Sequence, residues 1–105
     1  MWKHDKRKEI IMFKLFRILG NGEVGVPFRA DTAEEIAKHI EERELKHFYV
    51  CRRTNTGLQA VIMRVDGSEF YIRSNKMPAS LRKVYDRLRE AHEREVLENM
   101  ERGNE

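Results

Sequence analysis

The sequence predicts an α+β fold in which an antiparallel sheet of about five strands packs with two helices, in the order β-β-α-β-β-β-α. Two turn signals, Asn21-Gly22 and Asp66-Gly67, each lie between apolar runs, which is the strongest short-range indication of a β-hairpin. Two further segments carry apolar residues at helical spacing. A chain of 105 residues suits one domain. We expect it over residues 10–103, after a mobile basic arm at 1–9.

The first hairpin follows the arm. Its leading run, IIMFKLFRIL, has a helix as the alternative, because the nearby basic residues fall near one helical face. The hairpin is favoured, since Asn21-Gly22 supplies the positive φ angles of a type I′ turn. The strands then lie at about 10–19 and 23–29. Pro27 lacks an amide proton, which places the second strand at a sheet edge or at a bulge.

The segment 31–45 predicts an amphipathic helix of about 13 residues. Asp31 or Thr32 caps it, and Glu35 stands three residues after Thr32, the spacing of a capping box. The acidic first turn also suits the positive end of the helix dipole. One face of this helix is therefore expected to pack on the sheet.

A longer helix is expected at about 78–102, beginning at Pro78, a residue favoured at the first helical position. Its apolar stripe is regular as far as Ala91 and then thins, while opposite charges accumulate at i,i+4 spacing. About 24 residues span roughly 36 Å, which is longer than a domain of this size needs. The second half of the helix is expected to project or to meet a partner helix.

Residues 48–73, between the two helices, predict three strands joined by two turns. A type I′ turn at Asp66-Gly67 would pair Val65 with Ser68 and Met63 with Phe70. That register puts an apolar set on the core face and Ile62 on the other. The core set is Val61, Met63, Val65, Phe70 and Ile72.

The first of these two turns, TNTG, leaves two registers open. A two-residue loop at Asn55-Thr56 puts Phe48 and Val50 on the core face, and a three-residue loop puts them on the opposite face. The first register is favoured, because it buries Phe and Val. It sends Tyr49, Cys51 and Arg53 to the other face.

That other face is a candidate surface for single-stranded nucleic acid. Aromatic rings offer stacking platforms for bases, and arginines pair with phosphates. The basic arm could add phosphate contacts, whose affinity falls steeply with salt. The candidate residues are Tyr49, Arg53, Arg64, Tyr71 and Arg73 on the sheet and Lys6, Arg7 and Lys8 on the arm.

The first strand is apolar on both faces, so something must cover its second face. Two coverings remain open, namely the long helix on the face opposite the first helix, or a second copy of the chain. A homodimer is therefore favoured over a monomer. The candidate dimer or partner contacts are Phe13, Leu15, Leu88, Ala91 and Leu97.

The sequence contains no pattern typical of a catalytic or metal-binding site. The single cysteine, Cys51, has neither a disulfide partner nor a second cysteine for zinc, which favours a reducing cytoplasm. The histidines have no metal-ligand spacing, and the paired carboxylates lie in charged helices. We therefore expect no enzyme, no metal, no cofactor and no membrane span.

The favoured function is a small non-enzymatic binding module, a regulator or inhibitor that acts by binding a protein partner, of the kind that phages and other mobile elements encode. The alternative is a protein that binds single-stranded RNA or DNA through its basic and aromatic sheet face. Net charge is only +3, but residues 1–30 and 46–78 each carry +4 while 31–45 carry −4. The basic excess thus lies in the predicted strands.

Overall fold

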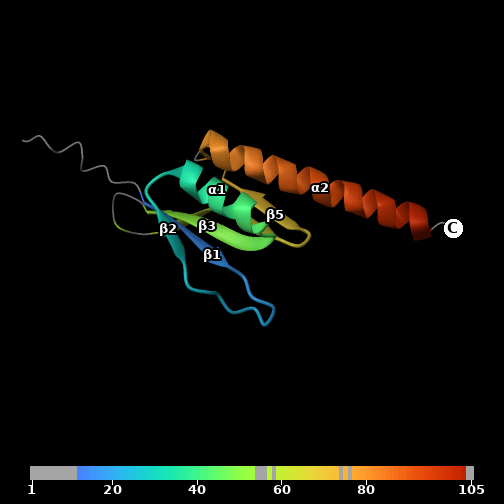
Figure 1. Ribbon diagram of the computed structural model, residues 1–105, viewed down its shortest axis with the longest axis horizontal. Coiled ribbons are helices and arrows are strands. Elements are labelled where there is room, and N and C mark those ends of the chain that lie inside the picture. Colours follow the sequence, from blue (N-terminus) through green and yellow to red (C-terminus); the bar gives the residue numbers. More distant parts are fainter. Residues whose placement is uncertain (1–11, 54–56, 58, 74, 76, 104–105) are drawn as a thin grey trace, which may run out of the picture.

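The computed structural model describes residues 12–53, 57, 59–73, 75 and 77–103, and the predicted order β-β-α-β-β-β-α is confirmed there (Figure 1). The five strands form one antiparallel sheet in the order β2-β1-β3-β4-β5, so β3 is central. The predicted arm, with its three basic candidates, lies outside the described residues. The elements are β1 (Phe13–Arg17), β2 (Phe28–Ala30), α1 (Ala33–Arg43), β3 (His47–Arg53), β4 (Gln59–Asp66), β5 (Glu69–Ile72) and α2 (Ala79–Gly103).

The bounds of α1 follow from its capping residues. Thr32 Oγ1 accepts the amide proton of Glu35 at 3.3 Å, which is the N-cap bond of the predicted capping box. The Thr32 hydroxyl also donates to the Glu35 carboxylate at 3.1 Å. At the other end Glu44 adopts the left-handed conformation (φ 52°), and the Leu45 amide donates to the carbonyl of Ile40. This turn closes the helix at 11 residues, slightly shorter than expected.

The first hairpin is less regular than predicted. The expected strand 23–29 is reduced to the three residues of β2, with an isolated bridge between Ile18 and Val24. The turn is not type I′, because Gly22 has a positive φ (87°) and Asn21 does not. Hydrogen bonds of Leu19 to Gly22 and to Glu23 enclose a three-residue loop instead. The predicted edge position of the Pro27 strand is confirmed, since β2 ends the sheet.

The β4-β5 turn is also displaced from its predicted position. Val65 pairs with Phe70 and Met63 with Ile72, so the two loop residues are Gly67 and Ser68. Of these two, Gly67 alone has a positive φ (67°), as a type II′ turn requires. The pairing differs from the prediction by two residues, and a shift of two leaves the side chains of β5 on their expected faces.

A β-bulge in β4 overturns one predicted pair of positions. Val50 pairs with Met63, but the next residue, Cys51, pairs with Val61, which leaves Ile62 as the extra residue. Ile62 is therefore buried in the core at 1% exposure, and Val61 lies on the opposite face. The prediction had these two residues exchanged, because strict alternation contains no bulge.

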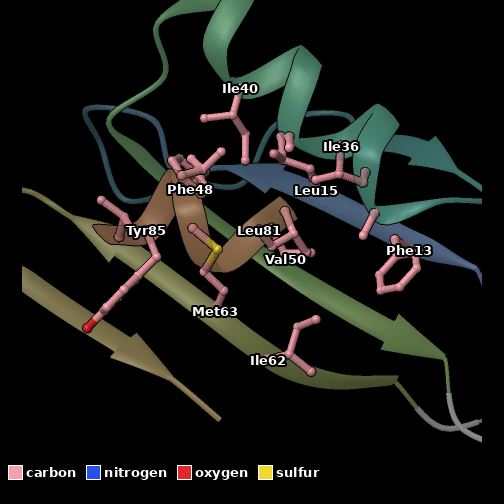
Figure 2. Packing of buried hydrophobic residues seen from close by; sticks show 14 of the residues in the cluster. Phe13, Leu15, Ile36, Ile40, Phe48, Val50, Ile62, Met63, Leu81 and Tyr85 are labelled. Atoms are coloured by element: carbon pink, nitrogen blue, oxygen red, sulfur yellow. The ribbon is translucent and has the colours of Figure 1, made fainter. Parts of the chain in front are cut away.

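Both described helices pack on the same face of the sheet (Figure 2). Ile36 and Ile40 of α1 and Leu81 of α2 join one cluster with the central strands, whose Phe48 and Val50 are fully buried as predicted. Of the two coverings left open for the second face, the long helix is therefore excluded, because α2 packs on the same face as α1.

Phe13 and Leu15, two of the candidate partner contacts, also belong to this core. Their exposures are 5% and 1%, so the chain's own helices enclose them, and they present no surface to a partner. Leu88 is half-buried and packs against the same cluster, and Ala91 is half-buried. Leu97 is 58% exposed.

Candidate nucleic-acid interface on the open sheet face

The face of the sheet opposite the helices carries a row of side chains that runs across four strands. Phe16 of β1 pairs with Tyr49 of β3, Tyr49 with Arg64 of β4, and Arg64 with Tyr71 of β5. No other element within the described part of the chain lies over this face. We call these four residues the aromatic row. Adjacent strands are about 4.8 Å apart, so the row spans roughly 14 Å.

The rings of the aromatic row differ in their exposure. Phe16 and Tyr49 are half-buried and stack on each other, with 5.0 Å between ring centroids and 19° between ring planes. Tyr71 stands apart from them and is 45% exposed. Burial, and the neighbouring Cys51, raise the pKa of the Tyr49 hydroxyl, while Arg64 opposes that shift. Tyr49 is therefore a neutral platform at physiological pH.

Arg64 is oriented by two carboxylates. Its Nη2 lies 3.0 Å from Oδ2 of Asp66, and its Nε lies 3.8 Å from Oε1 of Glu69. Asp66 also accepts a hydrogen bond from His47 at 2.9 Å. That hydrogen bond, together with Arg64, lowers the pKa of the Asp66 carboxyl. The guanidinium is thus held in the row with an orientation set by its neighbours.

The charge on the open face is mainly positive. Alternation along the strands places five cationic side chains there against two carboxylates, Asp66 and Glu69. The carboxylates both lie beside Arg64, so the end of the face nearer Arg53 is the more positive. The five cations are Lys14, Arg29, Arg53, Arg64 and Arg73.

A pocket of about 230 Å³ opens at that positive end. Lys14 and Cys51 are cross-strand partners, as are Arg53 and Gln59, so three neighbouring strands contribute side chains to it. Cys51 is buried, and burial raises the pKa of its thiol, although Lys14 opposes the shift. The lining is Met12, Lys14, Cys51, Arg53, Gly57 and Gln59.

Sequence reasoning found part of this surface. Among the candidates on the sheet, Tyr49, Arg64 and Tyr71 share the aromatic row, while Arg53 lies in the pocket and Arg73 follows β5 on the same face. Phe16, Lys14 and Gln59 were missed. Because these residues alternate with core residues, their spacing could have placed them on the open face. No local pattern predicts which residues of β3 they pair with.

Comparison with known proteins gives no match, whether to family models, to curated proteins or to solved structures. Among the described residues there is no cluster of three or more His, Cys, Asp or Glu side chains that could hold a metal ion. None of the described helices is long and apolar enough to cross a membrane.

Proposed function

We propose that this protein binds single-stranded nucleic acid on the open face of its sheet. The observation that carries the proposal is the aromatic row, in which three rings and an arginine lie in register across four adjacent strands. Bases stack on exposed rings regardless of their identity, and a flat sheet face leaves room for several bases at once.

The charges around the row fit the same ligand. Phosphates of a strand whose bases stack on Tyr71 and Tyr49 would pass over the cationic side chains on the Arg53 side of the aromatic row. Arg53 and Arg73 are exposed, and no ion pair of either is found within the described part of the chain. Such side chains neutralise phosphates with release of counterions, which makes affinity depend steeply on salt.

The first test is fluorescence anisotropy of labelled single-stranded RNA, single-stranded DNA and duplex DNA titrated with the intact chain. We expect binding of the single strands that weakens sharply between about 50 and 200 mM salt. Replacing Tyr71 with Ala should weaken that binding by about 5- to 150-fold, because stacking of one base on a ring stabilises the complex by about 1–3 kcal/mol.

Tyr71→Phe is the matched control, because it keeps the ring and removes only the hydroxyl. It should retain most of the affinity if stacking is the main contribution. Equal affinity of the Tyr71→Ala variant and the parent protein, or preference for the duplex, would count against the aromatic row as the site.

A second candidate function, regulation through a protein partner, is favoured by the distal half of α2. Every residue from Glu93 to Gly103 is exposed, and the helix runs on past the sheet (Figure 1). An unpacked helical extension has little to stabilise it in isolation. It nevertheless presents three large apolar side chains, Val96, Leu97 and Met100, at 41%, 58% and 60% exposure.

For this candidate we propose a second copy of the chain as the contact, which makes light scattering the appropriate test. A homodimer should give twice the 12.6 kDa mass of the chain, and Leu97→Asp should return it to the monomer mass. Lys83→Asp, an exposed position on the proximal half of the same helix, is the control and should leave the dimer intact. A monomer mass for the parent protein at micromolar concentration would contradict the homodimer.

For either function we propose that the protein is located in a reducing compartment, the cytoplasm. The support is chemical, because Cys51 is the chain's single cysteine and lies buried as a thiol on the sheet. No step of catalysis is included in the proposal.

A further inference from the structure

The pocket at the positive end of the open face is distinct from the aromatic row. It is formed where β1, β3 and β4 lie side by side, and Lys14, Cys51, Arg53 and Gln59 contribute its polar side chains. Gly57 forms part of the rim with a positive φ of 89°, a conformation suited to glycine. A β-carbon at Gly57 would lie 3.9 Å from Nη2 of Arg53, so the guanidinium is beside this part of the backbone.

The charge of the lining indicates what it can hold. Lys14 and Arg53 bring two positive charges, and no carboxylate belongs to the lining. Within the described part of the chain neither cation forms an ion pair with an acidic side chain. Burial disfavours the thiolate of Cys51, so that side chain adds no compensating negative charge. Gln59 adds a neutral amide whose two N–H groups can donate.

From this arrangement we infer that the pocket binds a phosphomonoester group. A terminal phosphate carries about −1.5 to −2 charges at neutral pH, which matches two cations, whereas a phosphodiester within a strand carries only one. Arginine pairs with phosphate through two parallel hydrogen bonds, and lysine adds a compact point charge.

The size of the pocket agrees with this ligand. Its volume of about 230 Å³ equals that of roughly eight water molecules. Pockets for complete drug-sized ligands measure about 300–1,000 Å³. The space therefore suits a phosphate and the atoms that directly follow it, and the rest of the ligand would lie outside.

Two sources supply a phosphomonoester, namely a small free phosphate ester and the phosphorylated end of a nucleic-acid strand. The pocket and the aromatic row share one face, so a strand could place its end in the pocket. The inference does not depend on nucleic-acid binding, since inorganic phosphate alone should enter the pocket.

The test is nuclear magnetic resonance of the ¹⁵N-labelled intact chain, titrated with inorganic phosphate and, at equal ionic strength, with sodium chloride. We expect the side-chain amide signals of Gln59 and the backbone amide of Gly57 to shift saturably with phosphate and not with chloride. Lys14→Met should weaken the phosphate affinity by about tenfold or more, the usual scale for a charge-assisted hydrogen bond. Lys46→Met removes an equal charge beyond the other end of β3 and should leave the affinity unchanged.

A second variant tests the inference even if the Lys14→Met protein does not fold. Gln59 is exposed, so Gln59→Glu should preserve the fold while its carboxylate expels the phosphate. Absence of saturable shifts, an equal response to chloride, or full phosphate binding by Gln59→Glu would each overturn the inference.

A last titration compares adenosine monophosphate with oligonucleotides that carry either a 5′-phosphate or a 5′-hydroxyl. If the mononucleotide binds as tightly as the phosphorylated strand, the pocket takes a free phosphate ester. If the phosphorylated strand binds at least about tenfold more tightly than the mononucleotide and the hydroxyl strand, the pocket takes a strand end. Tyr71→Ala should leave inorganic phosphate binding intact, which separates failure of the pocket from failure of the aromatic row.

Discussion

The two faces of the sheet are built from the same strands and yet have different composition. On the helix-covered face, Phe48, Val50 and Met63 are completely buried. The residues that alternate with them along the strands lie on the open face and include aromatic rings, cationic side chains and a thiol. Their exposure ranges from the buried Cys51 to the exposed Arg53. Packing restricts the residues of the helix-covered face by their volume, whereas the residues of the open face are less restricted by packing and can differ in chemistry.

Two adjacent residues of β4 should show the largest difference between the two faces. Ile62→Lys places a charge in the core, and we expect it to cost at least about 5 kcal/mol, comparable with the whole stability of a small domain. Val61→Lys, one residue away on the open face, should fold and lose about 1 kcal/mol or less. Circular dichroism with urea unfolding measures both. An equal loss of unfolding free energy in the two variants would contradict the difference in burial between Ile62 and Val61.

A smaller effect is expected from truncating one ring on each face. Phe48→Ala should lower the free energy of unfolding by about 3–5 kcal/mol, because the ring is fully buried between the central strand and the helices. Tyr71→Ala should lower it by about 1 kcal/mol or less, since Tyr71 is 45% exposed on an edge strand. Urea midpoints of the two variants give the comparison directly. A larger loss for Tyr71 would mean that the open face is a second core.

The smallest effect concerns a polar group at the margin of the covered face. His39 of α1 stacks on Phe28 of β2, with 3.9 Å between ring centroids and 10° between planes. Burial, aided by the nearby Arg43 and Arg17, lowers the pKa of the imidazole below its usual 6.5. Folding therefore favours neutral His39. Its contribution to stability is complete well above pH 6.5 and decreases as the pH falls from there through the lowered pKa.

His39→Phe isolates this contribution, because it keeps a ring against Phe28 and removes the titrating group. The stability of the parent protein should decrease relative to the variant between about pH 7.5 and pH 5.5. Urea unfolding at both pH values gives the difference. A constant difference between the two proteins would mean that His39 has the same pKa in the folded and unfolded chains.

Local chemistry allowed much of the fold to be predicted. The Thr32 cap, the turn glycines and the helical and alternating spacing of apolar residues each act within a few positions of the chain. They predicted the order of the elements and most core residues. They also identified Tyr49, Arg64 and Tyr71 as surface candidates, because burying Phe and Val in one register leaves Tyr and Arg on the other face.

The remaining features depend on contacts between segments that are distant in the sequence. The bulge at Ile62 allows Met63 to pair with Val50, and Val65 with Phe48, on the core face. No local pattern of residues predicts this bulge. Because α2 packs beside α1, no described element covers the second face of the sheet. β1 lies next to β3, which brings Phe16 to Tyr49 and Lys14 to Cys51. Outside the bulge, spacing along the chain specifies which face a side chain takes, but its neighbours on that face follow from the register between strands that are far apart in sequence.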